Sequence, residues 1–287
     1  MDIPSHWQLC MLDIIAEYMV NRFLETIGRP TRPTPALPDT SIPLSVVCEV
    51  DRIVWSMAKA YQNQKALGSN ETGTNKAREK ALKERFSVEK DEELVCKLTL
   101  LLDQTGVIMA WHLPGVLSEE FQVGVQRNLE FLFPDISRSI ISLRSWRTQE
   151  DLFMESRIRG AIELSPAWYQ QGRVPYRHQP EVSAILKASH ANPGPQQWLR
   201  ARALQNAILS ATLVVMHPDL YALGRENLLK VAGSTQDEDM QQIIPEWPTV
   251  YSVVSVIANR ATPFHRDLSC QVQWLDMLET IGGDPDL

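Results

Sequence analysis

The segment from Val250 to Asp267 constrains the fold more than any other part of the chain. It opens with an almost continuous apolar, β-branched run made of Val250, Val253, Val254, Val256 and Ile257. A run of this kind is typical of a buried strand. Pro263 interrupts it, and His265 and Asp267 follow two residues apart. We therefore expect a strand that leads directly into an imidazole and a carboxylate.

The spacing of His265 and Asp267 suits a metal site. In an extended segment, side chains two residues apart point to the same face. One imidazole and one carboxylate are two of the three ligands in the facial triad that holds non-haem Fe(II) and leaves open positions for oxygen and a co-substrate. None of the twenty residues after Asp267 is a histidine, so the third ligand of the triad is missing from that stretch.

The residues from His265 to Leu268 also match the start of the protein-kinase catalytic loop. That loop requires an asparagine five residues after its aspartate, where it holds a second magnesium ion. The chain has Val272 at that position, and it lacks a glycine-rich phosphate loop, a V-A-I-K lysine and a D-F-G sequence. The kinase interpretation is therefore excluded.

Three blocks of sequence carry a more specific pattern. One runs N-R-A-T-P-F-H-R-D over residues 259–267, followed by W-L-D-M-L over 274–278. A second is L-S-P-A-W-Y-Q-Q-G over 164–172, and a third is the apolar A-T-L-V-V-M-H-P over 211–218. Together they resemble the TET/JBP family of Fe(II)- and 2-oxoglutarate-dependent oxygenases, in particular the set expanded in mushroom-forming fungi. The resemblance covers roughly residues 94 to 280.

The resemblance implies a double-stranded β-helix of the jelly-roll class. Fe(II) would be held by His265, Asp267 and a histidine several strands later, and an arginine beyond that histidine would clamp 2-oxoglutarate. Asn259 and Arg260 match the family block and are candidates for the co-substrate or substrate side. Because neither the second histidine nor the arginine follows Asp267, the resemblance implies a C-terminally truncated oxygenase domain that is inactive as it stands.

The substrate implied by the resemblance is the methyl group of 5-methylcytosine or thymine in DNA, with the base flipped into a pocket beside the metal. A DNA substrate implies a nuclear location. Two alternatives stay open. The chain could be a non-catalytic helical interaction protein derived from such a domain, or a complementing C-terminal chain could donate the missing strands and ligands.

Composition limits these possibilities. A hydrophobic content of 44% over 287 residues is ordinary for a protein with a packed core. The net charge of −7 provides no general basic field for phosphate backbones, so any contact with DNA must be local. Four scattered cysteines, no basic leader and no long apolar run predict an intracellular protein without a zinc site, disulfide framework or membrane span.

We expect an α+β, helix-rich chain in three parts. Residues 1–65 form an N-terminal helical region with a proline-rich connector, residues 66–93 a charged helical or flexible linker, and residues 94–287 the partial oxygenase domain with an incomplete jelly-roll core. Periodicity predicts helices at 5–27, 44–64, 117–133 and 198–216, a hairpin over 94–111 and a flexible acidic loop at 233–240.

Three further residues invite a functional interpretation. Trp168 and Tyr169 could stack on a base, but we expect them to be core aromatics. His217 could bind a metal, but its position after an apolar helix favours complementing the negative end of the helix dipole.

Overall fold

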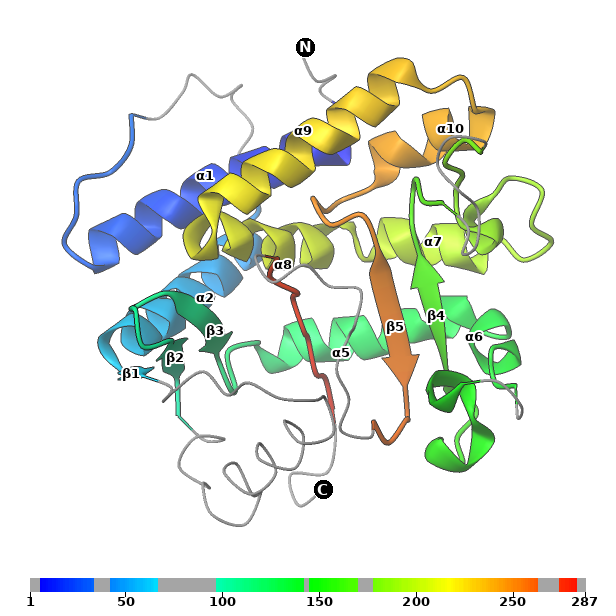
Figure 1. Cartoon of the computed structure of the whole chain (residues 1–287), viewed down its shortest axis with the longest axis horizontal. Helices are drawn as coiled ribbons and strands as arrows, with labels where there is room; N and C mark the ends of the chain where they lie inside the picture. Colours follow the sequence, from blue (N-terminus) through cyan, green and yellow to red (C-terminus); the bar gives the residue numbers. More distant parts are fainter. Residues whose placement is uncertain are drawn as a thin grey trace. The chain divides into compact units, whose positions relative to one another are not determined.

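The computed structural model describes residues 6–33, 42–66, 97–141, 145–169, 178–262 and 274–282 (Figure 1). Helices and strands are mixed, as expected for an α+β chain. The chain divides into two compact units, which we call the small unit (residues 19–118) and the large unit (residues 1–18 and 119–287). The predicted linker lies almost entirely outside the described residues.

The small unit contains the end of α1 (Gln8–Thr26), α2 (Leu44–Gln62) and a three-stranded sheet. The strands are β1 (Gln64–Ala66), β2 (Thr99–Leu102) and β3 (Ile108–His112). β1 is parallel to β2, whereas β2 and β3 form the antiparallel hairpin that the sequence predicts. The turn of the hairpin is fixed by Asp103, whose carboxylate accepts hydrogen bonds from the backbone N–H groups of Thr105 and Val107, both at 2.8 Å.

The first two predicted helices are confirmed as α1 and α2. Their apolar residues recur at three and four positions and are buried, as in an amphipathic helix that packs on one face. These residues are Leu9, Leu12, Ile15, Met19 and Phe23 in α1, and Val46, Val50, Ile53, Val54 and Met57 in α2. Among the described residues, no helix is long and apolar enough to cross a membrane.

Helices dominate the large unit. They are α5 (Glu119–Asn128), α6 (Asp135–Arg138), α7 (Gly194–Ala201), α8 (Ala203–Met216), α9 (Pro218–Ser234) and α10 (Glu238–Glu246), with 3-10 turns at Leu129–Leu132, Trp146–Thr148, Glu150–Leu152 and Ala184–Leu186. α8 packs against both α7 and α9. Apolar residues surround nearly its whole circumference, which is the pattern of a buried helix.

Three of the sequence predictions for the large unit need correction. The helix predicted at 198–216 is two helices, because the backbone leaves helical geometry at Arg202 with φ −93° and ψ 1°. The helix predicted at 117–133 ends at Asn128 and continues as a 3-10 turn. The acidic loop predicted at 233–240 is mostly helical, because Asp237 caps α10 by accepting a hydrogen bond from the N–H of Met240 at 2.8 Å.

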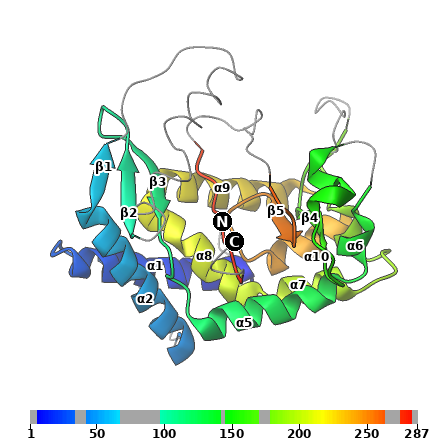
Figure 2. The same ribbon diagram turned by 90° about the horizontal axis from the view of Figure 1, so that it is seen from below.

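The only strand pair described in the large unit joins β4 (Gly160–Leu164) to β5 (Val254–Ala258), antiparallel and in continuous register (Figures 1 and 2). Gly160 faces Ala258, and Leu164 faces Val254. Gly160 has φ +136°, and a Cβ atom there would lie 1.9 Å from the carbonyl oxygen of Ile136. Only glycine therefore allows α6 to pack so closely on β4.

β5 confirms the predicted strand, but the strand is only partly buried. Ala258 is buried, whereas Ile257 is 48% exposed, because a two-stranded ladder has one face on the core and one face outward. The core of the large unit is a cluster that includes Leu132, Ile136, Leu164, Leu186, Trp198, Leu199, Ile243, Ile244 and Trp247. The described strands do not by themselves form a jelly roll.

Candidate functional site

The residues expected to bind a metal, His265 and Asp267, lie outside the described residues, together with the rest of 263–273. The structure does describe the end of β5 and the four residues that follow it, Asn259, Arg260, Ala261 and Thr262.

 In the sequence these residues lie between the ladder and the predicted metal ligands.

Asn259 makes the turn at the end of β5. Its φ of +54° lies in the left-handed region, which asparagine tolerates better than most residues. Its side-chain Nδ2 donates to the carbonyl of Ile158 at 2.8 Å, and its own carbonyl accepts from the N–H of Met154 at 2.8 Å. Asn259 is therefore held on both sides by the segment that precedes β4, which makes its described role a structural one.

Arg260 lies beside a second arginine and an indole ring. Its Nη1 donates to the backbone carbonyl of Arg147 at 2.8 Å. The guanidinium carbon of Arg260 lies 4.9 Å from the centroid of the Trp146 ring, and that of Arg147 lies 4.7 Å from the same centroid. Burial and the neighbouring charge of Arg147 lower the pKa of Arg260, although an arginine stays protonated at any physiological pH. Two positive charges thus share one aromatic ring at this end of the ladder.

Backbone pairing fixes the position of Arg260. Phe153 forms an antiparallel bridge with Arg260, and the N–H of Ala261 donates to the carbonyl of Leu152 at 2.7 Å. Within the segment 145–159 itself, Arg159 forms ion pairs with Glu150 at 3.4 Å and Glu155 at 2.9 Å. The residues after β5 are therefore anchored to the segment 145–159 by several independent contacts.

The three resemblance blocks all lie in the large unit, at different places. β4 leads directly into the block at 164–172, which starts at the end of the ladder opposite Asn259. Its Ser165 is buried and donates its N–H to the hydroxyl of Ser183 at 2.6 Å. The block at 211–218 is the end of α8, and one residue earlier the hydroxyl of Ser210 accepts from the N–H of Val250 at 3.1 Å.

The other aromatic and histidine candidates are assigned differently from their prediction. Tyr169 is 46% exposed and Trp168 is half-buried, with its backbone paired to Glu181, so the expectation that both are core residues is wrong. His217 is the C-cap residue of α8, where its N–H donates to the carbonyl of Leu213 at 2.7 Å. Its Nδ1 also accepts from the N–H of Leu220 at 3.2 Å and caps the start of α9, so its position joins the two helices.

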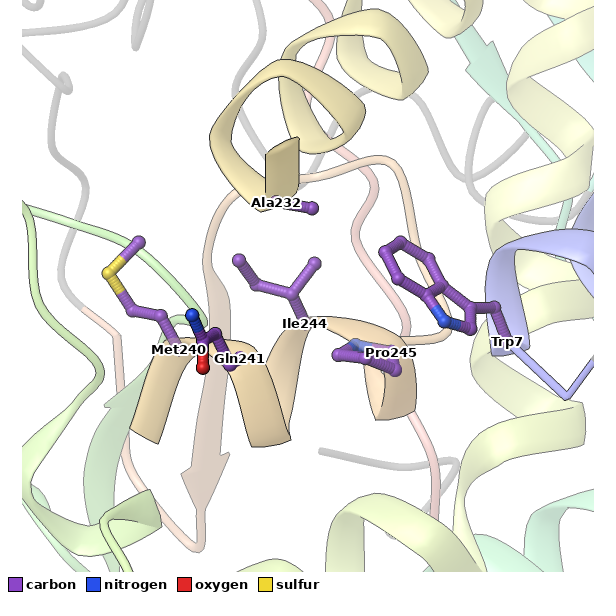
Figure 3. Close-up of a pocket in the computed structure, with 6 residues that line it drawn as sticks. All are labelled: Trp7, Ala232, Met240, Gln241, Ile244 and Pro245. Atoms are coloured by element: carbon purple, nitrogen blue, oxygen red, sulfur yellow. The ribbon is translucent and has the colours of Figure 1, made fainter. Parts of the chain in front are cut away.

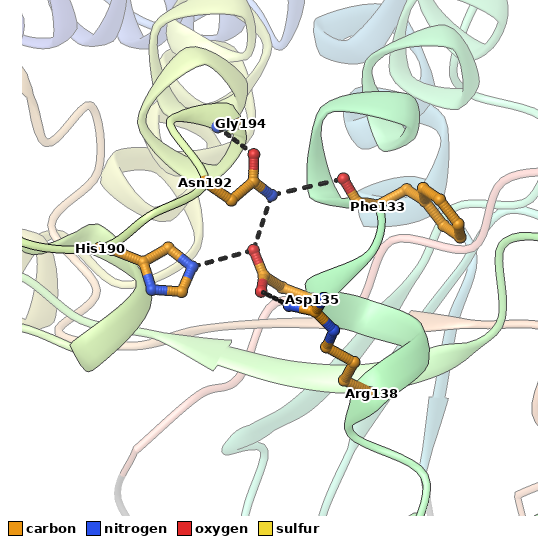
Figure 4. Close-up of polar contacts among 6 residues, drawn as sticks. All are labelled: Phe133, Asp135, Arg138, His190, Asn192 and Gly194. Carbon is orange, nitrogen blue, oxygen red and sulfur yellow. Dashed lines mark hydrogen bonds and ion pairs between the residues drawn. The ribbon is translucent and has the colours of Figure 1, made fainter.

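A polar cluster that the sequence did not suggest surrounds Asp135 at the start of α6 (Figure 4). Its carboxylate lies 3.0 Å from Nε2 of His190 and accepts from Nδ2 of Asn192 at 2.7 Å, with Arg138 at 3.8 Å. Asn192 in turn accepts from the N–H of Gly194 at 3.0 Å, at the start of α7. The cluster joins α6 to the residues before α7, since His190 and Asn192 are 55 and 57 positions from Asp135 in the sequence.

A small pocket in the large unit is lined by Trp7, Ala232, Met240, Gln241, Ile244 and Pro245 (Figure 3). Its volume is about 120 Å³. The amide of Gln241 supplies its polar edge and already donates to the carbonyl of Thr235 at 3.2 Å. With no charged side chain in its wall, this pocket has no feature that would orient a polar substrate.

The described residues contain no group of three or more His, Cys, Asp and Glu side chains that could hold a metal ion. His265 and Asp267 are suitable donors for Fe(II) in kind, since imidazole and carboxylate are two thirds of the facial triad, but they are one ligand short in number. No protein-family model matches the chain, and no curated protein matches it.

Proposed function

We propose that the chain forms part of a TET/JBP-like, Fe(II)- and 2-oxoglutarate-dependent oxygenase domain. Its substrate would be the methyl group of 5-methylcytosine or thymine in DNA. A DNA substrate implies a nuclear location. The observation that supports this most is the end of β5. The strand stops where the N-R-x-T-P-x-H-x-D pattern begins, and Asn259 and Arg260, its first two residues, are anchored to the segment 145–159.

In this proposal β4 and β5 would be among the first strands of a double-stranded β-helix. Closing that core takes more strands than the two of this ladder, which is the only strand pair of the large unit among the described residues. A complementing chain would be one source of such strands.

His265 and Asp267 would hold the metal. Bound Fe(II) would supply the oxidation of a substrate C–H bond by oxygen, coupled to decarboxylation of 2-oxoglutarate. The second histidine and the arginine that clamps the co-substrate have no counterpart after Asp267. We therefore expect weak metal binding and no turnover by these 287 residues alone.

Arg260 and Arg147 would supply the local positive charge that an acidic chain needs in order to approach DNA. The net charge is −7, so attraction to phosphate must come from particular side chains. Arg147 is exposed, and Arg260 lies next to it at the end of β5. This location suits a contact with the DNA backbone beside a flipped base.

The test is metal binding by the full chain. Mn(II), which prefers the same nitrogen and oxygen donors, would be titrated under electron paramagnetic resonance, where the signal of the free ion reports the unbound fraction. We expect H265A and D267A each to weaken binding by about tenfold or more. H178A is the matched control, because His178 is an exposed histidine outside the proposed triad.

Equal Mn(II) affinity of the full chain, H265A and D267A would overturn the proposal. The interaction-protein alternative would then be preferred, because it requires no metal. A parallel loss of affinity in H178A would show that the ion binds histidines generally.

A further inference from the structure

The break between α7 and α8 buries a charge. Arg202 occupies the break and is only 4% exposed. Its backbone N–H donates to the carbonyl of Trp198 at 2.9 Å, and its carbonyl accepts from the N–H of Asn206 at 2.9 Å. Its guanidinium carbon lies 5.8 Å from the centroid of the Trp198 ring. The backbone is therefore arranged so that a fully charged side chain points inward, where charge is costly unless it is well paired.

The guanidinium is paired through one of its three nitrogens. Nη2 donates to Oδ1 of Asn206 at 3.1 Å and to Oε2 of Glu279 at 2.8 Å. Glu279 belongs to the described C-terminal segment 274–282, which has no regular secondary structure, and this bond joins the segment to Arg202 at the break before α8. This ion pair is monodentate, because it uses one nitrogen of Arg202 and one oxygen of Glu279. A bidentate pair would instead use two parallel hydrogen bonds.

The remaining side-chain polar atoms of Arg202, Asn206 and Glu279 are buried and have no hydrogen-bond partner among the described residues. They are Nε and Nη1 of Arg202, Nδ2 of Asn206 and Oε1 of Glu279. Three are donors and one is an acceptor, so the cluster has a surplus of N–H groups. A buried donor without an acceptor is destabilising, and such groups are rare in folded proteins unless something fills the gap.

We propose that Arg202 and Asn206 form a binding site for a small carboxylate, and that Glu279 occupies this site in the free chain. The site needs two acceptor oxygens in one plane, which matches the fork of a guanidinium and the geometry of a carboxylate. A free carboxylate replaces Glu279 and does not join it, because two carboxylates beside one arginine would bury an uncompensated negative charge. Binding therefore breaks the ion pair that joins the segment 274–282 to Arg202.

This site shares no residue with the proposed iron site, because it includes neither His265 nor Asp267. Acetate is the probe, because it has the carboxylate but lacks the 2-oxo group through which a co-substrate would bind iron. A negative result with acetate therefore does not count against the oxygenase proposal. A negative result with Mn(II) does not count against the carboxylate site at Arg202.

The experiment compares the full chain with three variants. E279A removes the internal carboxylate, and E279Q removes its charge while keeping its shape. The double variant R202M/E279M replaces the ion pair by apolar residues of similar size, a change that folded proteins often tolerate. Acetate affinity is measured by calorimetry and by the rise of Tm with acetate, against sodium chloride at equal ionic strength.

We expect acetate to bind E279A and E279Q about tenfold more tightly than it binds the full chain, because Glu279 no longer competes. We also expect acetate to speed hydrogen exchange at the amides of residues 274–282 in the full chain. R202M/E279M should show neither effect. The proposal is overturned if acetate raises Tm no more than chloride does in both E279A and E279Q, or if R202M/E279M binds acetate as tightly as they do.

Discussion

Two buried charges in the large unit are accommodated in different ways. Asp135 is 8% exposed, and one oxygen of its carboxylate lies within hydrogen-bond distance of donors on both His190 and Asn192. Arg202 is 4% exposed, and two of its three nitrogens have no partner among the described residues. Asp135 is the first residue of α6, and Arg202 occupies the break between α7 and α8.

The difference separates a structural cluster from a candidate binding site. A buried charge that is well hydrogen-bonded holds its neighbours in one arrangement and has little to offer a ligand. A buried charge with unused donors is less stabilising and gains from an added acceptor. Asp135 therefore has a structural role, because it connects α6 to the start of α7. Arg202 is instead a candidate binding site, where one carboxylate can replace another.

The largest expected effect comes from removing the well-paired charge. D135A removes the acceptor of His190 and one of the two acceptors of Asn192, whose Nδ2 also donates to the carbonyl of Phe133 at 3.3 Å. We expect it to lower the free energy of unfolding by about 3 kcal/mol. Urea titration of the full chain measures this value. E155A is the control, because the side chain of Glu155 is 90% exposed in its ion pair with Arg159, and it should change stability by less than about 0.5 kcal/mol. A D135A variant as stable as E155A would contradict the structural role of the cluster.

The next effect comes from the incompletely paired charge. R202M leaves the carboxylate of Glu279, whose side chain is 15% exposed, without its cation, and we expect a loss of about 2 kcal/mol in the free energy of unfolding. R202M/E279M removes both charges and should recover most of that loss, to within about 1 kcal/mol of the full chain. If R202M is more damaging than D135A, or if the double variant is no better than R202M, the contrast between the two clusters fails.

The smallest effect belongs to an exposed carboxylate, Asp103 in the turn between β2 and β3. Hydrogen bonds from the N–H of Val107 and from Thr105 lower the pKa of Asp103 below its ordinary value of 3.8. The ionised form therefore stabilises the folded state at pH values above 3.8, and this contribution is lost as the pH falls through the lowered pKa. D103N keeps an acceptor oxygen but no charge. It should be slightly less stable than the full chain at pH 6, and the difference should shrink steadily as the pH is lowered below 3.8. A difference that stays constant over this whole pH range would show that charge is not the cause.

Local patterns in the sequence predicted much of the fold. The spacing of Leu9, Leu12 and Ile15 identified α1, and the run from Val253 to Ile257 identified β5. Periodicity failed where a side chain overrides it. Periodicity predicts that an arginine in an apolar helical pattern is exposed. Arg202 is buried instead, and it lies at the break that separates α7 from α8.

The polar clusters could not be predicted, because each depends on residues distant in sequence. Arg202 and Glu279 are 77 positions apart, and Asp135 and His190 are 55 apart. The available signal was weak: a charged residue in the middle of an otherwise apolar helical pattern. For Asn259 and Arg260, resemblance identified the positions, and the structure describes their contacts with Ile158 and Arg147. His265 and Asp267 stay predictions.

The ladder between β4 and β5 also bears on the order in which the large unit assembles. Its contacts join distant parts of the chain, since Gly160 pairs with Ala258 and the contact of Arg260 with Arg147 spans 113 positions. α7, α8, α9 and α10 follow one another with short connections and can pack early, whereas long-range pairing must first overcome the entropy of closing a large loop. The ladder is then a late step, and until it forms the β-branched residues of β5 have no partner strand. Folding intermediates of this protein should be most prone to aggregate through that segment.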